Sequence, residues 1–326
     1  MPGVQIGRWR IAQRSTMPFG AKNVVTVEQR ERLRNKSRCA RVVWSSSVAM
    51  SFPPTLTRKF LMQNSPSNPS AYLGQLLKKP GGVKIGVGVT SPSPELVQML
   101  ANSGFDYILI DMEHGPISIE TAYRMITAMI GTPAQPWIRV SHNDPAQFKL
   151  ALDAGAKNIV VPMITSREEA QKAVSYAKYP PQGVRGWGPF RTQYQWQTNM
   201  LDYAKRANAE TGVIALIEHP DAVRDIDAIL DVDGLAGAIP APFDLSVNMG
   251  FNDGPNHDKV RHAIEFVISR IKAKSMEVTS FAVTPAQAVE AMRLGVNNLF
   301  LGFDPMYIQA SLQLFLSTVS DLNIAR

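Results

Sequence analysis

The sequence has 326 residues but almost no cysteine, and this shortage excludes several kinds of site. Its one cysteine, Cys39, rules out a disulfide within the chain and any zinc or iron–sulfur site built from several cysteines. The chain also lacks any run near the ~18 consecutive apolar residues that read as a membrane-spanning helix. We therefore expect a soluble, globular protein with no membrane partner.

Acidic residues are scarce in the first seventy residues, and this imbalance accounts for the formal net charge of +7. Residues 1–70 hold 12 Lys/Arg but only 2 Asp/Glu, whereas residues 71–326 hold 22 Lys/Arg and 25 Asp/Glu. The larger part of the chain is therefore mildly acidic, which argues against a nucleic-acid partner. We predict an N-terminal extension over residues 1–70 and one globular domain over residues 71–326.

The extension lacks sustained apolar periodicity, so we expect it to be disordered or to carry a targeting signal. Its arginine- and serine-rich, acid-poor composition resembles that of a mitochondrial transit peptide. A disordered tail is one alternative, and a translation start further along, at Met17 or Met50, is another. We expect a cytoplasmic protein, with a mitochondrial location as the alternative.

From residue 71 on, short apolar, β-branched segments alternate with amphipathic segments of helical period. The expected strands are residues 83–89, 107–111, 137–140, 158–162, 213–218, 235–239, 277–281 and 298–302. Helices are expected between them, as at residues 94–102, 145–154, 167–177, 258–273 and 285–294. Continuously apolar strands are typical of a parallel sheet that is covered by helices on both faces.

Eight such strands in about 255 residues predict a (β/α)8 or TIM barrel, whose usual length is ~250 residues. A doubly wound open sheet is the alternative within the α/β class. The first expected strand, however, is not followed by the G-x-G-x-x-G turn of dinucleotide-binding folds. The barrel is therefore the better prediction.

Polar residues gather where the expected strands end, which is the end of a barrel that carries catalytic groups. Asp111 closes the second strand and His114 follows it, while Arg139 lies in the third strand. Glu218 closes the fifth strand, and Asp244 follows the sixth. Ordinary structural roles exist for each of them, such as a helix N-cap for Asp244 or a structural ion pair for Arg139. Because these charges meet on one rim, we favour a single site.

Two carboxylates without cysteine or a histidine pair favour a hard divalent cation bound through oxygen. Glu218 and Asp244 would leave about four octahedral positions for water and a chelating 2-oxo acid. Such a cation stabilises the enolate that forms when the neighbouring C–C bond breaks, and an arginine adds positive charge beside it. His114 suits proton transfer, and Asp111 and Asp153 are candidates for holding its tautomer. No lysine ends an expected strand, which argues against a Schiff-base aldolase.

Several segments resemble the HpcH/HpaI aldolase family of metal-dependent class II aldolases, which are (β/α)8 barrels. They are IDMEHGPI at 110–117, IRVSHNDP at 138–145, LDAGAKNIVVPM at 152–163, GVRGWG at 183–188, IE at 217–218 and PFDLS at 242–246. The order and spacing of these segments agree with the family from about residue 83 to residue 306.

The resemblance implies a role for each polar residue on the rim. Glu218 and Asp244 would bind the metal, which would be Mg2+, Mn2+ or Co2+. His114 would be the general acid/base, oriented by the two aspartates named above, and Arg139 would stabilise the enolate.

The resemblance also implies cleavage of a 4-hydroxy-2-oxo acid to pyruvate and an aldehyde, by a homohexamer whose subunits exchange their last helix. One alternative is an oxaloacetate decarboxylase or a C–C bond-forming enzyme of secondary metabolism similar to macrophomate synthase, which resembles the same group. A catalytically silent barrel that serves in binding or assembly is another. The complete set of rim residues argues against the silent barrel.

Three further residues concern the substrate. By the resemblance, the backbone around Phe243 would hold the substrate carboxylate. Ala241 stands where the family has glycine, and it cannot adopt the conformations that only glycine adopts. Leu216 stands where the bacterial heptanedioate aldolases have glutamine. Both changes bear on the fit of the substrate, and neither alters the expected metal ligands or the base.

Overall fold

The computed structural model describes residues 82–251 and 254–321, so the extension predicted over residues 1–70 lies outside the described residues. All described residues belong to one compact unit. The boundary expected near residue 70 therefore stays a prediction.

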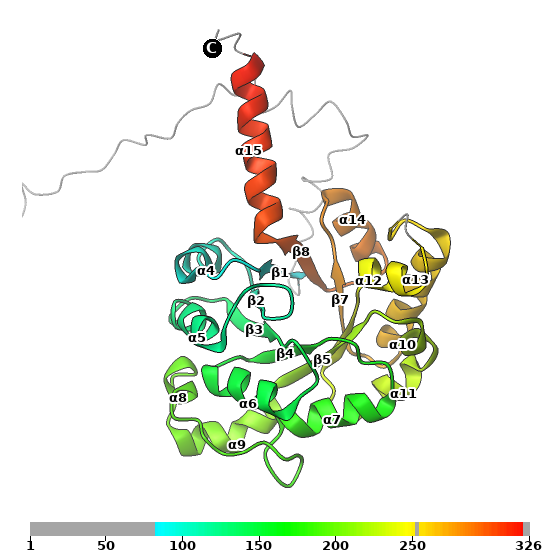
Figure 1. Cartoon of the computed structure of the whole chain (residues 1–326). Helices are drawn as coiled ribbons and strands as arrows, with labels where there is room; N and C mark the ends of the chain where they lie inside the picture. Colours follow the sequence, from blue (N-terminus) through cyan, green and yellow to red (C-terminus); the bar gives the residue numbers. More distant parts are fainter. Residues whose placement is uncertain (1–81, 252–253, 322–326) are drawn as a thin grey trace, which may run out of the picture. The chain divides into compact units, whose positions relative to one another are not determined.

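Eight parallel strands form a closed barrel in chain order (Figure 1). They are β1 (Lys84–Val89), β2 (Tyr107–Asp111), β3 (Gln135–Arg139), β4 (Asn158–Val161), β5 (Gly212–Ile217), β6 (Gly237–Pro240), β7 (Glu277–Phe281) and β8 (Asn298–Phe303). The last strand closes the sheet by pairing in parallel with the first, with Lys84 opposite Asn298. The predicted (β/α)8 barrel is confirmed.

Helices follow the strands, and all but the last, which projects away from the barrel, surround it (Figure 1). They are α4 (Pro94–Ala101), α5 (Ile119–Thr127), α6 (Pro145–Ala154), α7 (Arg167–Ala177), α8 (Thr192–Gln195), α9 (Met200–Glu210), α10 (Pro220–Arg224), α11 (Ile226–Leu230), α12 (Pro242–Asn248), α13 (Asp258–Ala273), α14 (Pro285–Arg293) and α15 (Asp304–Asp321). Within residues 82–251 and 254–321, none of the helices combines the length and the apolar character of a membrane-spanning segment.

Local sequence signals set where several helices begin and end. The side chain of Asp144 accepts hydrogen bonds from the backbone N–H groups of Ala146 and Gln147, which caps the start of α6. Gly155 ends that helix with φ of 113°, a left-handed conformation that glycine adopts without steric cost. The helix is therefore fixed between the third and fourth strands.

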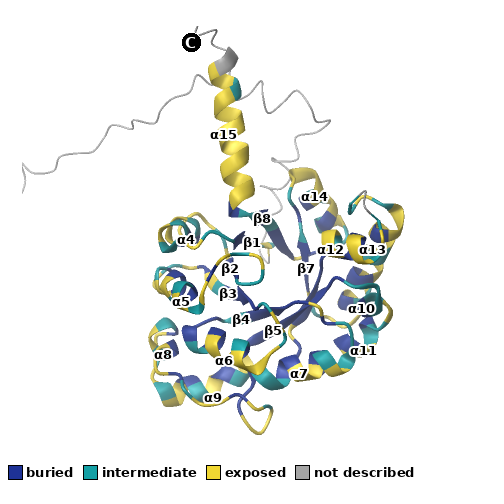
Figure 2. Cartoon of the chain, viewed as in Figure 1, coloured by how far each residue is buried: buried dark blue, intermediate teal, exposed yellow. Residues whose placement is uncertain are grey.

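A compact apolar cluster fills the inside of the barrel and separates its two ends. It consists of Tyr107, Leu109, Trp137, Val160, Ile214, Leu216, Ile239, Ala241 and Phe300. The rings of Tyr107 and Trp137 stack with their centroids 4.0 Å apart. Figure 2 shows the strands mostly buried and the outer faces of the helices exposed. Each end of the barrel is thus a separate place in which a site can form.

Candidate active site

A cavity of about 370 Å³ opens beyond the C-terminal ends of the strands. Predicted site residues from different strands line it together: Asp111, His114, Arg139, Ala241, Phe243 and Asp244. Glu218 lies directly after β5, beside this group, and its charge interacts with those of Asp244 and Arg139. The structure therefore brings the predicted rim residues to one end of the barrel.

Arg139, the last residue of β3, forms a two-point ion pair with Asp111, the last residue of β2. Its Nε donates to Oδ1 of Asp111 at 2.9 Å, and its Nη2 donates to Oδ2 at 2.5 Å. Both side chains are buried. Although burial alone would lower the pKa of Arg139, the hydrogen-bonded Asp111 carboxylate and the nearby acids raise it. The guanidinium is a permanent positive charge at the cavity.

Glu218 is a buried carboxylate held by the backbone of the β4–α7 connection. Its Oε1 accepts a hydrogen bond from the N–H of Met163 at 2.5 Å. Met163 has φ of 53°, the left-handed region that residues other than glycine seldom adopt. The pKa of Glu218 is raised to about 7. Burial is the largest cause and the negative charges of Asp244 and Glu113 add to it, whereas that hydrogen bond and the charge of Arg139 oppose it.

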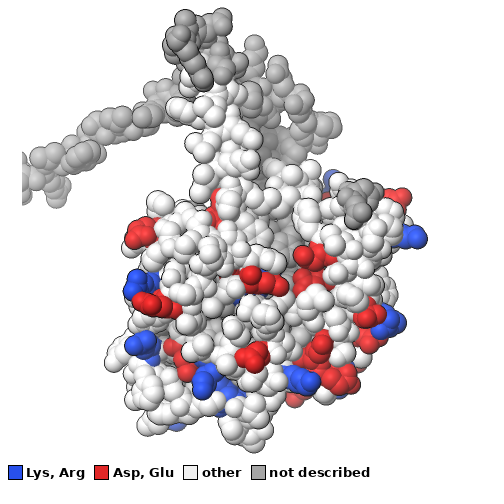
Figure 3. Space-filling model, in the orientation of Figure 1, with Lys and Arg blue, Asp and Glu red and all other residues white. Residues whose placement is uncertain are grey.

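Negative charge therefore accumulates at this end of the barrel. Asp244 lies in the first turn of α12, and its charge interacts with both Glu218 and Glu113. In Figure 3, acidic side chains lie near the centre of the barrel face turned to the viewer, whereas the basic ones lie mainly at its periphery. Carboxylates gathered in this way favour an added cation.

His114 lies at the cavity with an exposed side chain. Its Nε2 is 3.7 Å from Oε2 of Glu113, and its backbone N–H donates to Oδ1 of Asp111 at 3.2 Å. Asp153, on α6, forms an ion pair with Arg185 at 2.8 Å. Within the described chain, Asp111 thus holds the backbone of His114 and Asp153 holds Arg185. That these two aspartates orient the imidazole stays a prediction.

Of the two positions that depart from the family pattern, only Ala241 lines the cavity. Ala241 has φ of −106° and ψ of 94°, ordinary extended angles that any residue adopts, so glycine is not required there. Leu216 packs in the cluster inside the barrel and is not among the residues that line the cavity. Contact between Leu216 and a substrate stays a prediction.

The sequence interpretation gave no role to several residues that the structure places at the site. Glu113 lies 3.2 Å from Nε of Arg139, and burial raises its pKa despite the charges of Arg139 and His114. Apolar side chains also line the cavity: Phe281, Val283, Phe303 and Met306. Phe281 and Phe303 are the last residues of β7 and β8. The expectation that active-site residues lie at the C-terminal ends of barrel strands could therefore have identified them too.

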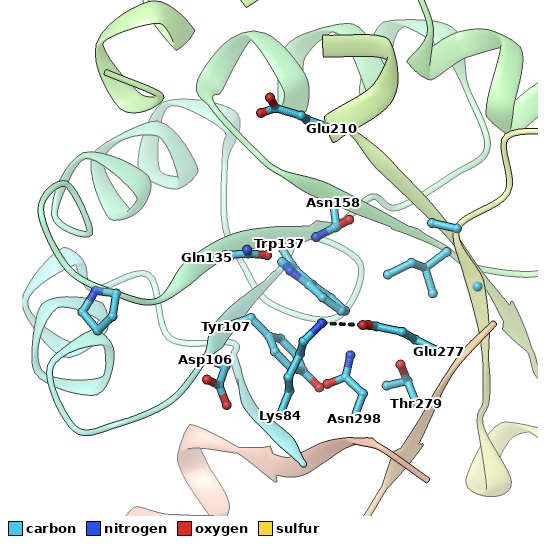
Figure 4. A pocket seen from close by; sticks show the side chains of 14 residues that line it. Lys84, Asp106, Tyr107, Gln135, Trp137, Asn158, Glu210, Glu277, Thr279 and Asn298 are labelled. Atoms are coloured by element: carbon cyan, nitrogen blue, oxygen red, sulfur yellow. Dashed lines mark hydrogen bonds and ion pairs between the residues drawn. The ribbon is translucent and has the colours of Figure 1, made fainter. Parts of the chain in front are cut away.

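A second cavity, of about 350 Å³, lies at the opposite end of the barrel, among the first residues of the strands (Figure 4). Lys84 and Glu277 form an ion pair there at 2.5 Å. None of the predicted site residues lines it. In (β/α)8 barrels the active site lies at the C-terminal ends of the strands. In this chain that end carries Asp111, Arg139, Glu218 and Asp244.

Comparison with known proteins agrees with this geometry. Residues 84–309 match the HpcH/HpaI aldolase/citrate lyase family. Over 226 residues, the chain is 36% identical to 4-hydroxy-2-oxo-heptane-1,7-dioate aldolase of Salmonella dublin, covering 69% of this chain and 86% of that protein.

Solved structures show the same relationship. An HpcH/HpaI aldolase/citrate lyase family protein from Burkholderia cenocepacia J2315 superposes with a TM-score of 0.70 and 26% identity, over 76% of this chain and 99% of that one. Macrophomate synthase shares the fold, with a TM-score of 0.66 and 22% identity over 77% and 90% of the two chains. The chain is therefore a lyase that belongs to the HpcH/HpaI aldolase/citrate lyase family.

Proposed function

We propose that this protein is a divalent-metal-dependent aldolase that cleaves a 4-hydroxy-2-oxo acid into pyruvate and an aldehyde. The observation that carries the proposal is that Asp244, His114 and the buried Arg139 line one cavity, and that the charge of Glu218 interacts with those of Asp244 and Arg139. The 36% identity to an aldolase whose named substrate is a 4-hydroxy-2-oxo acid supports it.

The donor set fits a hard cation such as Mg2+, Mn2+ or Co2+. Glu218 and Asp244 would supply oxygen ligands, and burial together with the negative charge of Asp244 raises the pKa of Glu218. No cluster of three or more histidine, cysteine, aspartate or glutamate side chains suits a metal in the described ranges. When bound, the cation would act as a Lewis acid toward the 2-oxo group of the substrate.

His114 and Arg139 carry out the proton transfer and the charge stabilisation that cleavage also needs. His114 takes the proton from the C4 hydroxyl of the substrate as the C3–C4 bond breaks and the aldehyde leaves. The bonding electrons pass to the C2 oxygen, and the fixed charge of Arg139 stabilises the resulting pyruvate enolate. Return of a proton to C3 gives pyruvate.

The backbone around Phe243 would bind the carboxylate of pyruvate. Phe243 lies in the first turn of α12, where backbone N–H groups have no partner within the helix, and its side chain is exposed at the cavity. We assign the substrate carboxylate to the backbone at this turn.

Pyruvate formation tests the proposal. The full chain with Mn2+ is assayed on several 4-hydroxy-2-oxo acids and on oxaloacetate, and the aldehyde is measured alongside pyruvate. Equal amounts of pyruvate and aldehyde are expected. Pyruvate from oxaloacetate alone would identify a decarboxylase instead, and no pyruvate from any substrate would indicate a silent barrel.

We also propose that the chain forms a homo-oligomer through α15, for which the family resemblance indicates a hexamer. Figure 2 shows this helix exposed along most of its length, and its exposed large apolar side chains include Ile308, Leu312, Leu314 and Phe315. Light scattering of the purified chain tests this. Whether the protein is cytoplasmic or mitochondrial rests on residues outside the described part of the chain and stays a prediction.

A further inference from the structure

One side of the cavity is an apolar wall, which we define as Phe281, Val283, Phe303 and Met306. Phe281 and Phe303 are the last residues of β7 and β8, so they face the charged residues at the ends of the other strands. Phe303 lies beside the charged group itself, because the guanidinium carbon of Arg139 is 5.7 Å from the centre of its ring. The wall and the predicted enolate site therefore share one cavity.

The two rings of the wall are fixed by packing inside the barrel. Buried Phe300 contacts both of them, with ring centroids 4.8 Å from Phe281 and 5.2 Å from Phe303. Gly88 of β1 leaves the space that Phe303 fills, since a Cβ at Gly88 would come within 2.4 Å of that ring. The wall is thus a preformed surface.

Met306 completes the wall from the first turn of α15. The start of this helix is tied to the end of β1, because the carboxylate of Asp304 accepts hydrogen bonds from the N–H and hydroxyl of Thr90. Asp304 is buried. The position of Met306 at the rim of the cavity is therefore set by the barrel.

The positive charge in the cavity comes from Arg139, which is not part of the apolar wall. Arg139 is the only lysine or arginine among the described residues that line the cavity. Its guanidinium is already engaged by Asp111 and lies 3.2 Å from Glu113. A second carboxylate on the substrate would meet apolar side chains and nearby acids, and burying a carboxylate without a partner is costly.

From these contacts we infer that the aldehyde released by this protein is uncharged and apolar, and that the apolar wall selects it. The inference rests on the proposed function and adds the chemical class of the leaving half of the substrate. With the enolate beside Arg139, the carbons beyond C4 extend from the charged group toward Phe303. The inference separates this chain from its dioate-cleaving relative, whose named substrate carries a carboxylate at both ends.

A matched pair of substrates tests the inference. The first is 4-hydroxy-2-oxooctanoate, which releases pentanal, and the second is the dioate cleaved by the relative, which releases an aldehyde of similar length ending in a carboxylate. With Mn2+, we expect kcat/KM for the octanoate to exceed that for the dioate by at least about tenfold, the effect of one or two well-buried methylenes. An equal or greater kcat/KM for the dioate overturns the inference.

A charge placed in the wall tests which residues select the substrate. Met306→Lys adds an ammonium group at the rim, and Met306→Gln is the neutral control of similar length. Met306→Lys should shift the ratio of the two kcat/KM values toward the dioate by roughly tenfold relative to Met306→Gln. No difference between the two variants would overturn the assignment of the wall.

The two proposals fail in different ways. If neither substrate yields pyruvate, the proposed function fails and the inference fails with it. If pyruvate forms from both but the dioate is preferred, the aldolase assignment stands and only the apolar aldehyde is wrong.

Discussion

Asp111 and Arg139 occupy opposing positions in the register of β2 and β3, and their side chains form a buried two-point ion pair at the end of both strands. The same aspartate accepts hydrogen bonds from the backbone N–H groups of Glu113 and His114. One carboxylate therefore fixes both the positive charge of the site and the turn that presents the histidine.

Asp111→Asn should destabilise the fold by about 3–5 kcal/mol, because it leaves the Arg139 guanidinium buried without its charged partner. Urea unfolding measures this loss. Asp202→Asn, which breaks the exposed pair with Lys205, is the matched control and should leave the free energy of unfolding nearly unchanged. Equal stability of the two variants would show that the buried pair is not essential to the fold.

The fold was largely predictable because the strong local signals coincide with the structure. The expected limits 145–154, 167–177 and 258–273 agree with α6, α7 and α13, each of which begins after a capping side chain. The third strand was expected to begin at Trp137 but begins at Gln135, because Gln135 pairs with Tyr107 of β2. Pairing with a neighbouring strand is not visible in local periodicity.

The candidate site was predictable only in part. The rule that catalytic groups follow barrel strands located Asp111, Arg139 and Glu218. It gave no role to Glu113, because contact with Arg139 depends on how the turn after β2 folds back. Nor did it indicate that Asp153 pairs with Arg185, since these residues lie on separate segments that meet only in the folded chain.

Replacing His114 should separate the two reactions that pass through the same enolate. His114→Ala should lower aldol cleavage by roughly two to four orders of magnitude, the usual contribution of a general base. Oxaloacetate decarboxylation needs no proton removed from a hydroxyl, so it should fall much less. Both rates are measured at saturating Mn2+ with metal content confirmed. Equal losses would mean that His114 positions the substrate instead.

The stability of the metal-free protein should depend on pH through Glu218. Its pKa is raised from 4.5 to about 7 in the folded protein, so between these values the folded state binds more protons than the unfolded state. Stability is therefore lost as pH rises through this range, by up to about 3 kcal/mol. Urea unfolding in EDTA should show this loss in the wild type and a smaller one in Glu218→Gln. Parallel curves for the two proteins would contradict it.

The buried hydroxyl of Tyr107 should contribute little to stability. It has no hydrogen-bond partner among the described residues, whereas its ring stacks on Trp137 beside the second cavity (Figure 4). Tyr107→Phe should leave the free energy of unfolding unchanged or raise it by about 1 kcal/mol, because it removes an unpaired polar atom. Tyr107→Leu, which loses the stacked ring, should cost about 2 kcal/mol or more. A similar loss in both variants would show that the hydroxyl is bonded.

The dependence of cleavage on a cation held by Glu218 and Asp244 is the feature that the proposed function requires. Its most direct test is the rate of pyruvate release from a 4-hydroxy-2-oxo acid, measured against free Mn2+ in the wild type and in Asp244→Asn. EDTA should abolish release in the wild type, and Mn2+, Mg2+ or Co2+ should restore it. Asp244→Asn should stay inactive at every metal concentration while its circular dichroism is unchanged. Full turnover of the wild type in excess chelator would show that cleavage needs no cation at Glu218 and Asp244.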